Sequence, residues 1–269
     1  MRRKRVRFKS IYCHGIETES VSRVLMYAIL VDIFRSLRAA RVLYDWGVMD
    51  SMLDDGIELK PNENEQDGQR PEHKVDAYFS ADVETDGPIP GPFSILSFGI
   101  VYAGCFDGRH FERPKKYDHV FYKELRPISE EFQLEALRVN GLDRWRLCLE
   151  GERPEKAMTE ACRWIRGVAG NARPVLVAYP LSFDWTWLYW YFIKFSADGS
   201  PFDYSRCFDV KTALAVKAGI PISEAGRSNI DPLLRSQRPH SHHALEDAIE
   251  QAEIFANIFE WRGVGGGTR

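Results

Sequence analysis

Two acidic residues, Asp82 and Glu84, stand close together at the end of a run that is typical of a β-strand. Because side chains alternate between the two faces of a strand, both carboxylates point the same way, about 7 Å apart along the strand. Two carboxylates on one face repel each other, and burying them is costly unless a cation lies between them. The spacing therefore suggests a divalent cation bound by oxygen ligands, with two solvated charges at a strand end as the alternative.

A third acid, Asp184, follows a short apolar run and lies at the start of an aromatic helix. The run at 174–178 (Pro-Val-Leu-Val-Ala) predicts a strand that is buried on both faces. An acid at this point either serves the helix N-terminus, where the dipole favours an anion, or completes a metal site. The aromatic residues at 185–192 lie all around the helix, which favours a place in the core over a platform for stacking bases.

A fourth acid, Asp247, lies at the start of the last predicted helix, shortly after His240, His242 and His243. Its neighbours along the chain include the small residues Ala244 and Ala248. The need to cap a helix does not explain an acid one turn inside it among such neighbours. A zinc site built from the histidines is the alternative, and it is disfavoured because no cysteine is near and two of the histidines are adjacent.

The patterns between these acids predict the elements that must position them. Strands are expected at 75–83, 93–103, 119–125, 174–178 and 207–210. Helices are expected at 130–139, 154–168, 182–195 and 243–261. The first three strands are joined by short, turn-rich connections, which favours an antiparallel meander. Strands followed by alternating strands and helices imply an α/β fold, with a mixed sheet and helices packed on its faces.

Composition limits the class of protein. With 269 residues, of which 44% are hydrophobic, the chain can bury one sizeable core. A net charge of −3 gives no global basic bias, so any contact with nucleic acid must be local. The five scattered cysteines form no Cys-x-x-Cys pair, which fits a reducing compartment. The longest apolar run near the start, 24–31, is too short to span a bilayer, and we expect a cytoplasmic protein without a membrane segment.

Residues 1–74 differ from the remainder and are predicted to be an N-terminal extension. A basic arm comes first, and an amphipathic helix is expected at about 20–44. The stretch 61–74 carries no large apolar side chain and is typical of a linker. The helix must bury its apolar stripe against the main domain or a second copy, so a homodimer is one expectation. A main domain at 75–262 and a flexible glycine-rich tail at 263–269 complete the expected organisation.

Three motifs together resemble those of the DEDDh 3′–5′ exonucleases, which belong to the RNase H-like superfamily. Asp82-Val-Glu84-Thr85-Asp-Gly87 is similar to the first motif of that family, Asp-x-Glu-Thr-x-Gly. Phe183-Asp184 is similar to the end of the second motif, and His242-x4-Asp247 to the third. The resemblance spans about residues 75–262 and implies an RNase H-like fold.

The resemblance also implies roles for these residues. Two Mg²⁺ ions, with Mn²⁺ as an alternative, would be bound by the carboxylates, and Asp82 would bridge them. Glu84 and Asp247 would complete one ion site, and Asp184 would hold the second ion. His242 would take a proton from the attacking water, with His243 as the adjacent alternative, because histidine titrates near neutral pH.

Further implications concern the substrate. Thr85, Gly87 and His242 would meet the terminal nucleotide at the 3′ end of single-stranded RNA or DNA, releasing nucleoside 5′-monophosphates. Where the second motif of the family often carries Asn, this chain has Pro180, which has neither an amide side chain nor a backbone N–H. This departure slightly favours RNA, by resemblance to bacterial exoribonucleases that tolerate such changes. The alternatives are an RNase H-like endonuclease, or an inactive nucleic-acid-binding or scaffold domain of the same fold.

Overall fold

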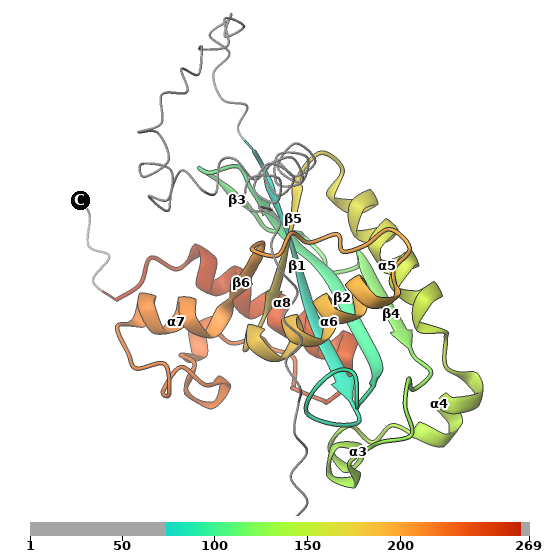
Figure 1. Ribbon diagram of the computed structural model, residues 1–269. Coiled ribbons are helices and arrows are strands. Elements are labelled where there is room, and N and C mark those ends of the chain that lie inside the picture. Colours follow the sequence, from blue (N-terminus) through green and yellow to red (C-terminus); the bar gives the residue numbers. More distant parts are fainter. Residues whose placement is uncertain (1–73, 265–269) are drawn as a thin grey trace, which may run out of the picture. The chain divides into compact units, whose positions relative to one another are not determined.

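A six-stranded mixed sheet is the centre of the computed structural model, which describes residues 74–264 (Figure 1). The strands are β1 (Asp76–Thr85), β2 (Ile95–Phe106), β3 (Phe111–Glu112), β4 (Val120–Glu124), β5 (Arg173–Ala178) and β6 (Cys207–Asp209). Their order is β3-β2-β1-β5-β6, and β4 also pairs with β2. Strands β1, β2 and β4 form the predicted antiparallel meander, whereas β5 and β6 run parallel to β1. The mixed sheet is therefore confirmed.

Helices cover both faces of this sheet. The α-helices of residues 74–264 are α3 (Leu134–Asn140), α4 (Arg144–Glu150), α5 (Pro154–Ala169), α6 (Leu181–Phe195), α7 (Val210–Ala218) and α8 (Ala244–Glu260). Helices α5 and α6 pack on one face, and α7 and α8 pack on the other (Figure 1). Central strand β1 is buried from Ala77 to Ala81 without alternation, because both of its faces are covered.

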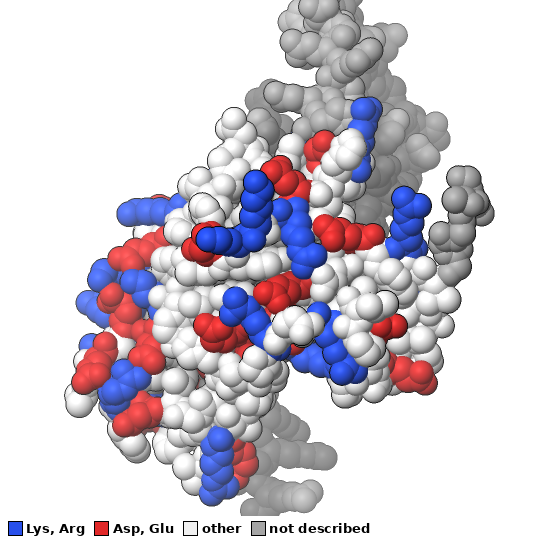
Figure 2. All heavy atoms as spheres, turned by 180° about the vertical axis from the view of Figure 1, so that it is seen from behind, with Lys and Arg blue, Asp and Glu red and all other residues white. Residues whose placement is uncertain are grey.

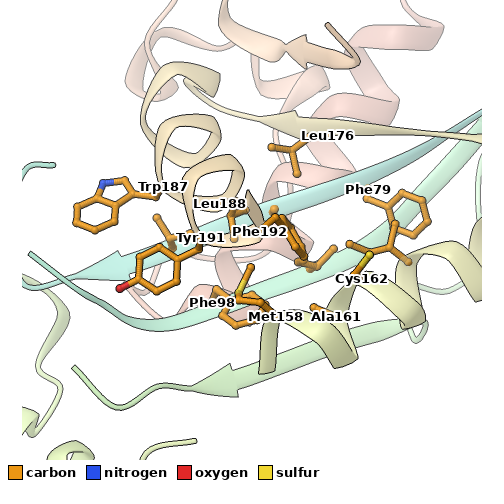
Figure 3. Packing of buried hydrophobic residues seen from close by; sticks show 14 of the residues in the cluster. Phe79, Phe98, Met158, Ala161, Cys162, Leu176, Trp187, Leu188, Tyr191 and Phe192 are labelled. Carbon is orange, nitrogen blue, oxygen red and sulfur yellow. The ribbon is translucent and has the colours of Figure 1, made fainter. Parts of the chain in front are cut away.

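The two cores use alternate residues of β1. Phe79 packs with Cys162 of α5 and Phe192 of α6 on one face, as Figure 3 shows. Its neighbour Tyr78 points to the other face and meets Phe255 of α8, with ring centroids 5.0 Å apart. Burial of each such side chain contributes about 1.5–3 kcal/mol.

The aromatic helix α6 belongs mainly to the core, as predicted. Trp187, Tyr191 and Phe192 are fully buried. Trp185 and Tyr189 are half-buried and stack on each other, with ring centroids 4.8 Å apart. The inward side of α6 therefore fixes the helix on the sheet, and its first turn is held at the end of β1.

The structure corrects several predicted boundaries. The helix predicted to start at residue 130 begins at Leu134, because the backbone N–H of Gln133 donates to the carbonyl of Asp86 and fixes the chain before it. Helix α4 was not predicted, since only Arg144 and Leu147 of its short span are buried, too few for a periodic pattern.

Helix α7 was missed as well, because it follows β6 without an intervening turn. Asp209 is the last residue of β6 and also the N-cap of α7, where its side chain accepts from the backbone N–H of Thr212. No Gly or Pro separates the two elements, so the sequence carries no signal for the change from strand to helix.

Four predictions concern residues that the structure does not describe. The basic arm, the helix at 20–44, most of the linker at 61–74 and most of the tail at 263–269 lie outside residues 74–264, so all four stay predictions. Within residues 74–264, no helix combines the length and the apolar character that crossing a membrane requires.

Candidate active site

Strand β1 ends at a cleft of about 610 Å³, and Asp82 and Glu84 line it. Val83, which lies between them, is buried in the core on the α6 side of the sheet. The predicted arrangement of the two acids on one face of the strand is therefore present. Glu84 is 9% exposed, yet among the described residues no group donates a hydrogen bond to its carboxylate.

Asp184 reaches the same strand end from helix α6. Its Oδ1 accepts a hydrogen bond from the backbone N–H of Val83 at 3.1 Å, and the side chain is buried. Pro180 occupies the N-cap of α6 and makes no side-chain capping bond. Asp184 therefore connects the helix to β1. It also lies in the first turn of α6, where the helix dipole favours an anion, so its role as a metal ligand stays a prediction.

Asp247 lies in the first turn of α8 and is fully buried. Its carboxylate accepts hydrogen bonds from the backbone N–H groups of Ser241 and His242, each at 2.8 Å. One carboxylate oxygen each of Asp82, Glu84 and Asp247 lie within 4.8 Å of one another. Two acids of β1 and one acid of α8, more than 160 residues away in sequence, thus form one cluster of oxygen ligands.

A close approach of α8 to the sheet makes this cluster possible. Gly99 of β2 pairs with Asp82 of β1, and the first turn of α8 lies directly above it. A Cβ atom at Gly99 would lie 2.5 Å from the Cα of Leu245, which is too short for any real contact. Only glycine permits helix and strand to come this close, so Gly99 is a requirement of the site that the sequence reasoning missed.

The acids strongly perturb one another. Burial, followed by the charges of Asp184, Glu84 and Asp247, raises the pKa of Asp82 well above its usual value. Burial, followed by the charges of Asp247 and Asp184, raises the pKa of Glu84 to about 8. Burial raises the pKa of Asp184 to about 7, against the lowering effect of its hydrogen bond from Val83. These carboxylates resist ionisation unless positive charge arrives.

Little positive charge is available from the protein itself. Arg227 is the one Lys or Arg among the described residues that line the cleft, and its guanidinium already pairs with Glu250 and donates to the carbonyl of Tyr179. The clustered oxygen ligands fit a divalent cation, since hard cations prefer carboxylate oxygens. Ligand atoms of His240, His242 and Asp247 also lie within 4.8 Å of one another. The alternative of a zinc site built from the histidines is therefore compatible with the geometry.

The three histidines differ in what they contact. His242 is exposed on the cleft wall and has a left-handed backbone with φ of 57°, held by the hydrogen bond from its N–H to Asp247. His243 is the N-cap of α8, and its ring stacks on Tyr122 with centroids 4.9 Å apart. His240 lies in the cleft with its Nδ1 3.1 Å from Asp247. This geometry favours His242 over His243 as a group that could meet a substrate.

Thr85 and Gly87 both line the cleft, as expected of residues that could meet a nucleotide. The hydroxyl of Thr85 donates to the carbonyl of Gly87 at 2.8 Å, and the carbonyl of Thr85 accepts from Asn140 at 3.0 Å. A Cβ atom at Gly87 would lie 2.2 Å from the ring of Phe93. The need for glycine at this position therefore has a packing reason that the sequence reasoning did not foresee.

Gln251 is the most informative residue that the sequence reasoning missed. Its side-chain amide donates to Asp82 at 2.7 Å and accepts from the backbone N–H of Tyr179 at 2.7 Å, while fully buried. It thereby connects the ends of β1 and β5. The available signal was its place in α8 one turn after Asp247, between the small residues Ala248 and Ala252, where a solvated amide would not be expected.

Comparison with known proteins gives one similar relative and a shared fold. No protein-family model matches the chain. The 3′–5′ DNA exonuclease Cap18 of Escherichia coli is 34% identical over 182 residues, which cover 67% of this chain and 90% of that protein.

Two solved structures share the fold at low identity. The nuclease domain of 3′hExo, a DEDDh family member bound to rAMP, has a TM-score of 0.53 and 11% identity, covering 71% of this chain and 94% of that chain. A full-length 3′-exonuclease has a TM-score of 0.52 and 12% identity, covering 72% of this chain and 64% of that chain.

Proposed function

This chain belongs to the DEDDh family of RNase H-like 3′–5′ exonucleases, and from this premise we propose a two-metal-ion mechanism at the cleft. The proposed reaction is hydrolysis of the last phosphodiester bond at the 3′ end of a single strand, with release of a nucleoside 5′-monophosphate. The observation that supports it best is the cluster of buried carboxylates without enough positive charge around it. In a catalytic domain, divalent cations would neutralise these carboxylates. A scaffold that only binds nucleic acid would not need such a cluster.

The four carboxylates have distinct places in this proposal. Asp82, whose pKa is raised by the charges of all three other acids, would be shared between two divalent ions. Glu84 and Asp247 would complete one ion site, and Asp184 would serve the other. When bound, Mg²⁺ or Mn²⁺ would lower the pKa of a water and neutralise charge on the phosphate oxygens. Gln251 would keep the Asp82 carboxylate in one orientation through its buried hydrogen bond.

We assign the role of general base to His242. The ring is exposed on the cleft wall, while its backbone is held by Asp247. A base must come within hydrogen-bond reach of the water that it deprotonates, and a ring on the cleft wall can do so. His243 is a poorer candidate, because its ring stacks on Tyr122 and its Nδ1 faces the N–H of Glu246.

The remaining cleft wall offers apolar surface for a nucleotide. Val139 and Phe183 line the cleft and are 58% and 39% exposed. Exposed apolar side chains beside a hydrophilic centre are suited to a base and a sugar, while Thr85 and Gly87 lie next to the acids. We therefore place the terminal nucleotide between these apolar residues and the end of β1.

The choice between RNA and DNA is the finer question. The relative Cap18 is named a DNA exonuclease, which favours DNA as the first polymer to test. The departure at Pro180 favoured RNA in the sequence analysis, and that preference stays a prediction. The boundary between residues 74 and 75 and the homodimer also stay predictions.

The decisive experiment offers the full chain 5′-labelled single-stranded DNA and RNA of equal sequence, with Mg²⁺ or with excess chelator. We expect a ladder that shortens one nucleotide at a time from the 3′ end, and no cleavage in chelator. Internal cuts at the earliest times would indicate an endonuclease. Cleavage that persists in chelator would contradict the metal mechanism, and the polymer that shortens faster identifies the substrate.

A further inference from the structure

A second hollow, of about 620 Å³, is lined by three basic residues and one acidic residue, Glu155. We call it the basic hollow and define it by the lining residues Gly91, Arg126, Arg153, Trp190 and Lys194. Arg126 and Lys194 are exposed, and neither forms an ion pair with any residue that the structure describes. Arg153 faces Glu155 at 3.7 Å in an exposed pair, which is a weak interaction. The basic hollow therefore keeps a net positive charge.

The basic hollow and the cleft share two walls. Helix α6 supplies Phe183 and Asp184 to the cleft and Trp190 and Lys194 to the basic hollow. Phe183, Trp190 and Lys194 are seven and then four residues apart, so they follow one stripe of the helix. At 1.5 Å per residue, Asp184 and Lys194 are about 15 Å apart along the helix axis.

The loop between β1 and β2 forms the other shared wall. Gly87 and Pro88 line the cleft, and Gly91 lines the basic hollow. A Cβ atom at Gly91 would lie 3.8 Å from the indole of Trp190, so the loop runs against the tryptophan ring. The same loop therefore contributes residues to both the cleft and the basic hollow.

The chemistry of the basic hollow suits a single strand of nucleic acid. Proteins bind single strands with cations that follow the backbone and with aromatic rings that stack on bases. Trp190 is half-buried, so one part of the indole stays accessible beside the two unpaired cations. On the face that Figure 2 shows, Lys and Arg are intermingled with Asp and Glu. Arg113 and Arg238, for example, pair with Glu260 and Glu253.

We propose that the basic hollow binds the phosphodiester backbone of the substrate strand on the 5′ side of the terminal nucleotide, with a base against Trp190. This inference rests on the proposed function, because it takes the cleft as the place of the 3′ end. The distance of about 15 Å corresponds to about four nucleotides of a stacked strand, at about 3.4 Å each. The basic hollow would therefore make the enzyme sensitive to substrate length beyond the reacting end.

The test compares two double variants with the same charge change. Arg126→Gln/Lys194→Gln removes the unpaired cations of the basic hollow. Lys115→Gln/Lys116→Gln removes two exposed cations from the β3–β4 connection and serves as the control. All four side chains are exposed, so both variants should fold, and far-UV circular dichroism checks this.

Binding is measured by fluorescence anisotropy, in chelator, with single-stranded DNA of two to twelve nucleotides. We expect affinity of the unmodified chain to rise with length up to about six nucleotides. The Arg126/Lys194 variant should bind long strands about tenfold more weakly and lose about 1.4 from the slope of log K against log salt, since each phosphate contact contributes about 0.7. Dinucleotide binding and the Lys115/Lys116 variant should be unchanged.

Two results would overturn the inference: affinity that is independent of strand length, or equal losses in the two double variants. The proposed function is judged separately, by cleavage with Mg²⁺. A chain that shows the expected length effect but cleaves nothing would contradict the proposed function and leave the basic hollow supported.

Discussion

Glu84 and Asp86 are buried acids two residues apart at the end of β1, yet their surroundings are opposite. Asp86 is fully buried and faces Arg144, whose Nε donates to Oδ2 at 2.8 Å, while the backbone N–H of Ser94 donates to Oδ1. Glu84 faces other carboxylates, and burial together with the charges of Asp247 and Asp184 raises its pKa to about 8. Burial raises the pKa of Asp86 as well, but the hydrogen bonds from Arg144 and Ser94 lower it, whereas no group among the described residues lowers the pKa of Glu84.

Asp86 supports the structure around the site. Arg144 also donates to the carbonyl of Ser129 and lies over the ring of Phe132 at 4.9 Å. The backbone carbonyl of Asp86 accepts from Gln133, directly before α3. This network ties the segment that carries one wall of the cleft to the end of β1. The difference teaches that a buried carboxylate with partners builds a fold, whereas one without partners marks a site for a ligand.

The largest expected effect comes from a substitution of Asp82, which belongs to the cluster of acids without a cation. Asp82→Asn should lower the exonuclease rate at least about 10³-fold, because a loss of about 4 kcal/mol of transition-state stabilisation slows a reaction to that extent. The initial rate of shortening of a 5′-labelled strand measures it. Asp86→Asn is the matched control, with the same chemical change four residues away, and should stay within about tenfold of the original rate if the chain folds. Equal losses in both would remove the distinction between the two acids.

The second largest effect concerns the stability of the protein and tests the pairing of Asp86 with Arg144. Arg144→Met should lower the free energy of unfolding by about 3–5 kcal/mol, because it leaves the buried Asp86 carboxylate without its cation. Urea denaturation followed by circular dichroism measures this. Arg138→Met is the control, since the Arg138–Glu135 pair is 75% and 81% exposed and should change stability by less than about 0.5 kcal/mol. A small effect at Arg144 would show that the network is dispensable.

The smallest expected effect is a pH dependence of the metal-free protein. The raised pKa values of Glu84, about 8, and Asp184, about 7, mean that the folded state holds protons more tightly than the unfolded state. In chelator, stability should therefore fall as pH rises from about 5 to about 8, by about 1–2 kcal/mol after screening by water. Thermal unfolding at several pH values measures it. Glu84→Gln should make stability depend less on pH, and Mg²⁺ should restore the stability of the original protein at pH 8. A stability that rises between about pH 5 and about pH 8 would contradict the electrostatic account.

Much of the fold could be predicted because its signals are local. The apolar run of β5 and the periodic pattern of α5 each contain enough information in one segment to identify the element. Helices α4 and α7 could not be predicted in this way. The first buries too few residues, and the second begins at the residue where β6 ends.

The candidate site likewise contains residues that the sequence predicts and residues that it does not. The resemblance of three short motifs to those of the DEDDh exonucleases predicted Asp82, Glu84, Asp184 and Asp247 as one site without the structure. Gln251 and Arg227 could not be found by spacing. Gln251 meets Asp82 across 169 residues of chain, and Arg227 reaches the carbonyl of Tyr179 across 48 residues.

The sequence by itself determined which acids the chain carries at the strand and helix ends, and the alternation that turns Asp82 and Glu84 to one face. Only the tertiary structure decided which acid has a partner. Arg144 meets Asp86 from 58 residues away, and α8 brings Asp247 to Glu84 because Gly99 lets the helix approach the sheet. The physical reason is that the charge state of a buried carboxylate depends on everything packed around it, and packing joins segments that no local pattern connects.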